Sequence, residues 1–290
     1  MKIHLVDGTY ELFRAYYGVP SVLSPDGTEV GAVRGLVQTL LSLLRQDDVT
    51  HVGCAFDSVV ESFRNKMFSG YKTSDGMPED IKNQFALAER AAKALGVVVW
   101  PMEEFEADDA IASAVHQWRD VSDVEQIIIC SPDKDLAQMV IGTRVVLLDR
   151  RRRITIDEEG VKDKFGVLPD SIPDYLALVG DAADGIPGIP KWGAKTASTV
   201  LKRYTHIEAI PESHLLWDAE VRGAKTVAEN LVTHKTDAFL YRELATLCVD
   251  VPILESIDDL KWVGAKRSEY VELCNDMGFD GLASSPNQWM

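Results

Sequence analysis

The chain has 290 residues, of which 46% are hydrophobic and 26% are charged, and its formal net charge is −16. This length and composition are typical of a globular protein with one large domain, or with a core domain and a smaller one. The acidic balance argues against a general nucleic-acid coat, because such surfaces carry excess lysine and arginine, but it does not exclude one basic face.

Membrane insertion and extracellular export are not indicated. No run approaches the roughly 18 apolar residues that a membrane span needs, and the N-terminus enters a strand-like pattern rather than a signal peptide. We therefore expect a cytoplasmic protein with no membrane partner. The four cysteines form no Cys-x-x-Cys pair and are predicted to be core thiols, not zinc ligands or disulfides.

Strand-like and helix-like patterns alternate along the first half of the chain. Apolar runs predict strands at residues 2–6, 51–56, 97–100 and 125–130. Helical periodicity predicts helices at residues 30–45, at 79–95 and from residue 106 onward. This alternation is typical of βαβ units and predicts an α/β fold with a mostly parallel sheet.

Aspartates follow three of these predicted strands. Asp7, Asp57 and Asp133 each lie just after an apolar run. Because ligands bind beyond the carboxyl ends of parallel strands, these side chains are expected at one edge of the sheet. A single aspartate there commonly makes a turn, but three of them favour a binding site.

A crowded acidic segment opens the helix predicted from residue 106. Glu106, Asp108 and Asp109 place three carboxylates within four positions. Like charges this close repel one another, so a hard metal ion is a natural partner. The alternative is an acidic first turn that complements the helix dipole, and this motif alone leaves both interpretations open.

Residues 144–148 and 153–156 are predicted to be strands on either side of four arginines, 150–153. Such a run is usually a solvated turn, and a DNA contact is the less favoured alternative. Beyond about residue 165 the strand-like runs give way to helical patterns, which indicates a helical second part.

The helical part contains a second acidic pair and a glycine-rich turn. Asp181 and Asp184, three residues apart, could close a metal site from its far side. The turn at 185–193 leads into a helix that carries Lys195. Backbone N–H groups at a helix start, with lysines beside them, can bind phosphate, although an ordinary tight connection between helices is the alternative.

Six motifs, in order along most of the chain, resemble those of the bacterial and phage 5′ nuclease family. This family comprises the 5′→3′ exonuclease domain of DNA polymerase I and its free-standing flap endonuclease relatives. The motifs are Leu5-Val6-Asp7-Gly8, Ala55-Phe56-Asp57, Phe63-Arg64 with Gly70-Tyr71-Lys72, Glu106-Ala107-Asp108-Asp109, Ser131-Pro132-Asp133-Lys134-Asp135, and Gly180-Asp181 to Ala197.

The resemblance implies a PIN-like α/β nuclease core with a mostly parallel central sheet at residues 1–168. A helical arch would cover the active site at about residues 60–95. A C-terminal helical DNA-binding part would follow at 169–290, with a helix-hairpin-helix-like motif at about 176–210.

The resemblance also implies two divalent metal ions, Mg²⁺ or Mn²⁺, and K⁺ at the hairpin. The ligands of the first ion would be Asp7, Asp57, Glu106 and Asp108. The residues that form or support the second site would be Asp109, Asp133, Asp135, Asp181 and Asp184. Nine carboxylates are many for two ions, so several are expected to act through bound water.

Basic and aromatic residues are expected to contact the substrate. Lys72 and Arg64 would add positive charge to the reacting phosphate. The remaining expected DNA contacts are Arg14, Tyr71, Gly188, Lys191, Gly193, Lys195 and Thr196. Phe68 and Tyr71 could stack on an unpaired base, or could pack the arch instead.

We therefore predict a structure-specific 5′ nuclease that acts on DNA flaps, nicks or 5′ ends in replication and repair. No polymerase portion follows, so a stand-alone nuclease is expected. A monomer is expected, and a separate DNA polymerase is an expected partner. The alternatives are a PIN-like ribonuclease and a catalytically silent DNA-binding relative. A haloacid-dehalogenase-like phosphatase is disfavoured, because Thr9 stands where its acid would be.

The chain departs from the family pattern in two places. Thr73-Ser74-Asp75 follows Lys72 where another basic residue is usual, which predicts a weaker grip on a 5′ strand. The hairpin reads Lys191-Trp192-Gly193 where Gly-Ile-Gly is usual, which leaves its phosphate and cation geometry open.

Overall fold

The structure is a computed structural model that describes all residues, 1–290. The chain forms two compact units. The first contains residues 1–62, 74–131 and 249–290, and the second contains residues 63–73 and 132–248.

A parallel sheet is the centre of the first unit. Its strands have the order β3-β2-β1-β4. The strand bounds are β1 Lys2–Asp7, β2 His51–Asp57, β3 Val98–Met102 and β4 Gln126–Cys130. Leu5, which is fully buried, pairs with Gly53 on one side and with Ile129 on the other. The predicted parallel sheet is confirmed.

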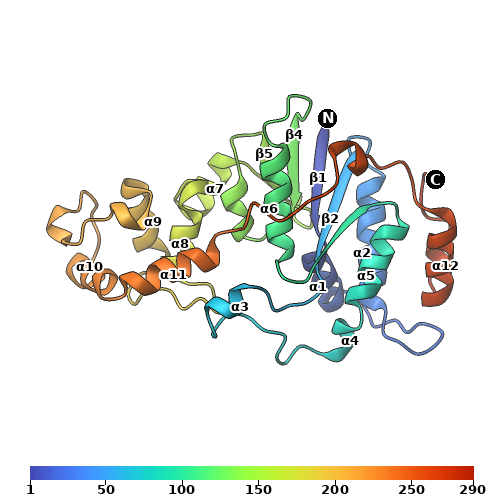
Figure 1. Ribbon diagram of the computed structural model, residues 1–290, viewed down its shortest axis with the longest axis horizontal. Helices are drawn as coiled ribbons and strands as arrows, with labels where there is room; N and C mark the ends of the chain where they lie inside the picture. Colours follow the sequence, from blue (N-terminus) through green and yellow to red (C-terminus); the bar gives the residue numbers. More distant parts are fainter. The chain divides into compact units, whose positions relative to one another are not determined.

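Helices cover both faces of this sheet (Figure 1). The connections from β1 to β2 and from β2 to β3 run one way across the sheet, and the connection from β3 to β4 runs back. Because such crossovers are right-handed, α6 lies on the face opposite α1 and α5. Helix α2 packs on α1 and α5, and α12 packs on α5. The bounds are α1 Gly8–Gly18, α2 Gly31–Leu44, α5 Phe85–Ala94, α6 Ala107–Trp118 and α12 Arg267–Met277.

The C-terminal segment returns to the first unit. Trp262 N donates to Thr50 O (2.9 Å), beside β2, and Lys266 N donates to Ala94 O (3.0 Å), at the end of α5. The compact units therefore differ from the predicted division at 168/169. Residues 249–290 pack on the sheet unit, whereas residues 132–168 belong with the helices.

The second unit combines a β-hairpin with a cluster of helices, drawn from green to orange in Figure 1. The two strands predicted around the arginines are confirmed as β5 and β6, and they pair in antiparallel orientation. Helix α8 packs against α9 and α11. The bounds are β5 Val145–Asp149, β6 Ile154–Ile156, α7 Glu158–Phe165, α8 Ile172–Val179, α9 Ala194–Tyr204, α10 Ala224–Thr233 and α11 Lys235–Ala245.

A continuous helical arch over residues 60–95 is not formed. The segment contains two helices of four residues each, α3 Arg64–Met67 and α4 Glu79–Lys82. Helix α5 belongs to the core, because it packs against β2 and β3. Gly70, Gly76 and Pro78 lie between the short helices, and such residues interrupt helical hydrogen bonding.

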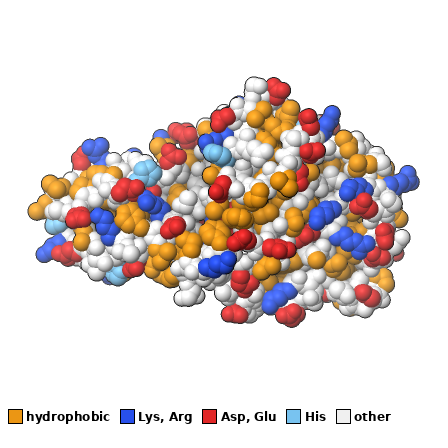
Figure 2. Space-filling view, in the orientation of Figure 1, with side chains coloured by type: hydrophobic (Ala, Val, Ile, Leu, Met, Phe, Trp, Pro, Cys, Tyr) orange, Lys and Arg blue, Asp and Glu red, His pale blue; other side chains and the backbone are white.

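None of the helices is both long enough and apolar enough to cross a membrane. The expected core thiols are confirmed for Cys54, Cys130 and Cys274, which are buried, and no disulfide forms. On the face shown in Figure 2, acidic and basic side chains are interspersed with hydrophobic ones and no broad basic patch is visible. This face therefore offers no broad basic surface to a polyanion.

Candidate active site

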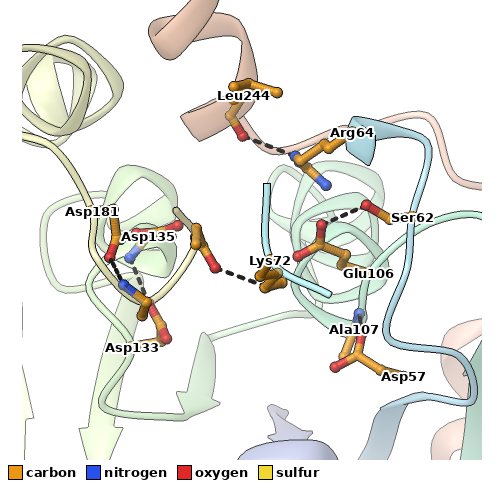
Figure 3. Close-up of polar contacts among 12 residues, drawn as sticks. Asp57, Ser62, Arg64, Lys72, Glu106, Ala107, Asp133, Asp135, Asp181 and Leu244 are labelled. Atoms are coloured by element: carbon orange, nitrogen blue, oxygen red, sulfur yellow. Dashed lines mark hydrogen bonds and ion pairs between the residues drawn. The ribbon is translucent and has the colours of Figure 1, made fainter. Parts of the chain in front are cut away.

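Two aspartates mark the carboxyl ends of neighbouring strands in the first unit. Asp7 ends β1, and its two carboxylate oxygens accept from Tyr10 N (2.8 Å) and from Ser131 Oγ (2.8 Å). Asp57 ends β2, and its Oδ1 accepts from Ala107 N (2.7 Å), the first residue of α6 (Figure 3). The predicted placement of these two side chains at one sheet edge is confirmed, because β1 and β2 pair in parallel.

The acidic start of α6 forms a capping box. Glu106 N donates to Asp109 Oδ2 (3.0 Å), and the Glu106 side chain accepts in return from the Asp109 backbone. Glu106 also accepts from Ser62 Oγ (2.7 Å; Figure 3). Asp109 is fully buried, so the expected helix-start role is realised for this residue. Asp108 is half-buried.

Three carboxylates of the second unit lie close together. Oxygens of Asp135, Asp181 and Asp184 all fall within 4.8 Å of one another. Asp135 and Asp181 are buried, and Asp135 Oδ1 has no hydrogen-bond partner. Burial, followed by the charges of nearby carboxylates, raises the pKa of Asp135 well above its ordinary value. An unsatisfied buried oxygen in an anionic cluster fits a hard divalent cation.

Hydrogen bonds within local turns orient the side chains of Asp133 and Asp181. Asp135 N donates to Asp133 Oδ1 (2.9 Å), and Ala183 N donates to Asp181 Oδ1 (3.0 Å). Such side-chain-to-backbone bonds hold short acidic turns in one conformation. Asp133 is exposed, whereas Asp135 and Asp181 are buried.

Two lysines neutralise part of this negative charge. Lys134 Nζ lies 2.7 Å from Asp181 Oδ1, and Lys72 Nζ lies 2.9 Å from Asp184 Oδ1 (Figure 3). Burial acts to lower the pKa of Lys134, but its hydrogen bond to Asp181 and the charges of the neighbouring carboxylates raise it overall. Lys134 was not among the predicted site residues, although its place between Asp133 and Asp135 was a usable signal.

Gly185 brings the Lys72 segment against the acidic loop. A Cβ atom at this position would lie 2.1 Å from Gly70 O, and Gly185 has a positive φ of 76°. Lys72 N donates to Asp184 O (3.0 Å) at the same place. The absence of a side chain at Gly185 is therefore required for this approach.

Three residues expected to contact the substrate, Arg14, Arg64 and Tyr71, are buried or bonded to other protein groups. Arg64 is 1% exposed and donates through Nε to Leu244 O (2.8 Å), and Tyr71 is 4% exposed. Arg14 donates to Glu11 and to Thr39 Oγ1 (2.7 Å). Neither the Arg64 nor the Tyr71 side chain is accessible in this structure, so the predicted contacts of Arg64 with phosphate and of Tyr71 with DNA are not formed here and stay predictions. Phe68 packs edge-on against Tyr241, with ring centroids 5.8 Å apart.

The hairpin before α9 keeps its shape despite the unusual residues. Gly188 and Lys191 have positive φ values of 73° and 70°. Trp192 is buried and donates through Nε1 to Val227 O (3.0 Å), and Gly193 caps α9. Lys191 therefore takes a backbone conformation that favours glycine, which explains why glycine is usual at this position.

Helix α10 begins with the same four residues as α9. Gly223-Ala224-Lys225-Thr226 repeats Gly193-Ala194-Lys195-Thr196. A cavity of about 790 Å³ lies between the two helix starts. Lys195 and Arg222 both line it. Arg222 was not among the predicted DNA contacts, although it directly precedes the second copy of the four-residue repeat.

Comparisons with known proteins cover nearly the whole chain. Residues 2–166 match the family described as 5′-3′ exonuclease, N-terminal resolvase-like domain, and residues 167–268 match 5′-3′ exonuclease, C-terminal SAM fold. A 5′-3′ exonuclease of Buchnera aphidicola subsp. Baizongia pistaciae is 35% identical, over 86% of this chain and 82% of its own length. DNA polymerase I of Pseudomonas aeruginosa is 34% identical over 95% of this chain. The chain spans only about 30% of that polymerase's length.

Solved structures share the fold at low sequence identity. A 5′-exonuclease of bacteriophage T5 has a TM-score of 0.67 at 17% identity, with 84% of this chain and 89% of that chain covered. Human GEN1 has a TM-score of 0.60 at 14% identity, with 96% of this chain and 68% of that chain covered. These similarities confirm the α/β core with its C-terminal helical part.

Proposed function

Because the chain belongs to the 5′-3′ exonuclease family, we propose that it is a metal-dependent, structure-specific 5′ nuclease. It would hydrolyse DNA phosphodiesters at flaps, nicks or 5′ ends in replication and repair. The observation that carries this proposal is the carboxylate trio of Asp135, Asp181 and Asp184, of which the first two are buried, beside the Lys72 ammonium group. The similar T5 enzyme supports it, because solved T5 structures contain divalent metal ions and, in one case, DNA.

We assign the carboxylates to two divalent cations, Mg²⁺ or Mn²⁺. One ion would be held by the trio of Asp135, Asp181 and Asp184 together with Asp133. The other would be held by Asp7, Asp57, Glu106 and Asp108, with Asp109 supporting Glu106 through the capping box. When bound, such ions lower the pKa of an attacking water and stabilise the leaving oxygen.

The two lysines beside the trio, Lys72 and Lys134, would have different roles. Lys72, 2.9 Å from Asp184, carries a positive charge at the edge of the trio and would stabilise charge that grows on the phosphate oxygens. Lys134 neutralises Asp181 and keeps the crowded carboxylates together. These two lysines replace the Lys72 and Arg64 pair predicted from the sequence.

The duplex part of the substrate would bind at the start of α9. The expected contacts are Gly188, Lys191, Gly193, Lys195 and Thr196, and the cavity beside them adds Arg222. Helix-start N–H groups with basic side chains suit a phosphodiester backbone. A K⁺ ion at the hairpin is part of this proposal, and tighter DNA binding in K⁺ than in tetramethylammonium would support it. A DNA polymerase is the proposed partner.

The test is cleavage of a 5′-labelled flap duplex, compared with blunt duplex and single strand, in Mg²⁺ and in EDTA. We expect Mg²⁺-dependent cutting near the flap junction and its loss in Asp181→Asn. Cutting that persists in EDTA, or in Asp181→Asn, would contradict the metal assignment. Tight binding of the flap without any cutting would instead identify a catalytically silent relative.

A further inference from the structure

The end of α11 is held by an unusual set of side chains. The last carbonyl groups of a helix have no partner within the helix. Here, Arg64 donates through Nε to Leu244 O (2.8 Å) and through Nη2 to Thr246 O (3.0 Å; the Leu244 bond is drawn in Figure 3). A buried guanidinium suits this place, because the C-terminus of a helix carries partial negative charge. We call residues 244–247 the strap.

Gln138 also hydrogen-bonds to the strap, and it links the strap to the acidic trio. Its Nε2 donates to Ala245 O (3.0 Å), and its Oε1 accepts from Leu247 N (3.0 Å). The same Nε2 also donates to Asp135 O (2.8 Å). The backbone of Asp135 is therefore tied to the strap by one side chain.

Arg64 belongs to the segment that carries Lys72. The neighbouring Asn65 donates through Nδ2 to Lys72 O (2.9 Å), and Phe68 N donates to Arg64 O (3.0 Å). Lys72 in turn contacts Asp184 through its backbone and through its ammonium group. A chain of contacts thus leads from the strap to Lys72 and on to the acidic trio.

Two chains of contacts, which we call arms, connect the strap to the carboxylate trio within the second unit. The first arm runs from the strap through Arg64 and Asn65 to Lys72 and Asp184. The other arm runs from the strap through Gln138 to Asp135. Because Asp135 and Asp184 belong to the same trio, the two arms meet at the carboxylates.

We propose that Arg64, Asn65 and Gln138 are positioning residues, and that the strap sets the distance between Lys72 and the carboxylate trio. This inference rests on the proposed nuclease function. The Gln138 arm governs the affinity of the trio for a divalent ion, because it fixes the backbone of Asp135. The Asn65 arm governs the chemical step through Lys72. A displacement of about 1 Å in such a site can lower the rate about 100-fold.

The first variant is Gln138→Met, which keeps the approximate length of the side chain and removes its hydrogen bonds. Gln84→Met is the matched control, because Gln84 is fully buried, donates to Asp80 O (2.9 Å) and accepts from Val33 N (3.1 Å). Gln84 contacts neither arm. The measurements are the melting temperature, Mg²⁺ affinity of the EDTA-stripped protein by calorimetry, and single-turnover flap cleavage.

We expect Gln138→Met to weaken Mg²⁺ affinity about tenfold beyond any effect of Gln84→Met. Equal Mg²⁺ affinities of the two folded variants would overturn the inference. This readout does not need activity, so it separates the inference from the proposed function, which fails if the unaltered protein does not cleave in Mg²⁺.

The second variant, Asn65→Leu, tests the other arm and keeps the inference testable if Gln138→Met does not fold. We expect it to lower the single-turnover rate about tenfold, to leave the Mg²⁺ affinity within about twofold, and to change KM little. The conservative variant Asn65→Gln should recover part of the rate. An unchanged rate in folded Asn65→Leu, or a rise in KM alone, would contradict a positioning role.

Discussion

At the scale of single residues, Asp135 links stability to metal binding. Its buried carboxylate is unsatisfied at Oδ1 and lies among other carboxylates. The folded protein therefore holds a charged group that it disfavours when no cation is bound. The proposed function makes the same group a metal ligand, so stability in the absence of metal and the proposed function place opposite demands on this residue.

Asp135→Asn should raise the melting temperature in EDTA at neutral pH and abolish cleavage. Because the folded pKa of Asp135 is raised, the folded state holds its proton up to a higher pH than the unfolded state does. The gain in stability from Asp135→Asn is therefore complete above the pKa that Asp135 has in the folded protein. It disappears as the pH falls to the ordinary aspartate pKa of about 4. Thermal melts in EDTA across this pH range measure the effect. Asp120→Asn is the control, because that side chain is 90% exposed. An equal rise in melting temperature in Asp120→Asn would contradict the idea that the crowded trio destabilises the metal-free protein.

Gly185→Ala should lower the cleavage rate about 10- to 100-fold, because its Cβ would meet Gly70 O at 2.1 Å and displace the Lys72 segment. The matched control is Gly76→Ala. Gly76 has a similar positive φ of 79° but no atom within 4 Å of the added Cβ, so it carries the same backbone strain without the clash. Similar rates in the two variants would show that backbone strain, not the close approach, is responsible.

Lys191→Gly should stabilise the protein by about 0.5 kcal/mol, because relief of the left-handed conformation outweighs the added flexibility of glycine. Lys266→Gly should instead destabilise the protein. Lys266 has a φ of −72°, so glycine relieves no strain there and only adds flexibility. Denaturant unfolding of both variants provides the test. A loss of stability in Lys191→Gly would mean that the hairpin is not held in this conformation in solution. The same variant should also weaken DNA binding, if Lys191 contacts phosphate.

At the scale of elements, the paired starts of α9 and α10 form the clearest candidate surface for DNA. Trp192 donates to Val227 O and Asn230 donates to Pro190 O (2.7 Å), so the turn before α9 is tied to α10 by two hydrogen bonds. This turn and α10 therefore form one support beside the cavity. The alternative of a simple helix connection does not account for the cavity with Lys195 and Arg222 on its lining.

Lys195→Ala and Arg222→Ala should each weaken duplex binding and reduce the slope of log affinity against log salt by about 1. Lys162→Ala is the control, since this lysine pairs with Glu159 (3.2 Å) on α7, away from the cavity. Fluorescence anisotropy over a salt series measures the slopes. An unchanged slope in both cavity variants would remove the α9 and α10 starts from the binding surface.

At the scale of the whole molecule, the negative net charge predicts that cations stabilise the folded protein. The net charge of −16 destabilises the compact state by self-repulsion, which monovalent salt screens. Site binding adds to this screening, and a ligand at about 100 times its Kd contributes about 2.7 kcal/mol. These two effects can be separated by comparing cations at equal ionic strength.

Mg²⁺ should therefore raise the melting temperature more than NaCl does at the same ionic strength, and EDTA should reverse the increase. Asp181→Asn should lose most of the increment that is specific to Mg²⁺, whereas Asp120→Asn should keep it. Identical melting temperatures in Mg²⁺ and in matched NaCl would indicate general screening and no metal site.

The sequence by itself determined the parallel sheet, the aspartates at the ends of β1 and β2, and the family. These features follow from local periodicity and from motif order, which short stretches of chain encode. Only the tertiary structure decided that Arg64 is buried beneath the strap, that residues 249–290 return to the sheet unit, and that Lys72 meets Asp184. These facts depend on packing between residues more than 100 positions apart in the chain. A side chain's neighbours, and not its place in a motif, determine whether it touches substrate or supports the group that does.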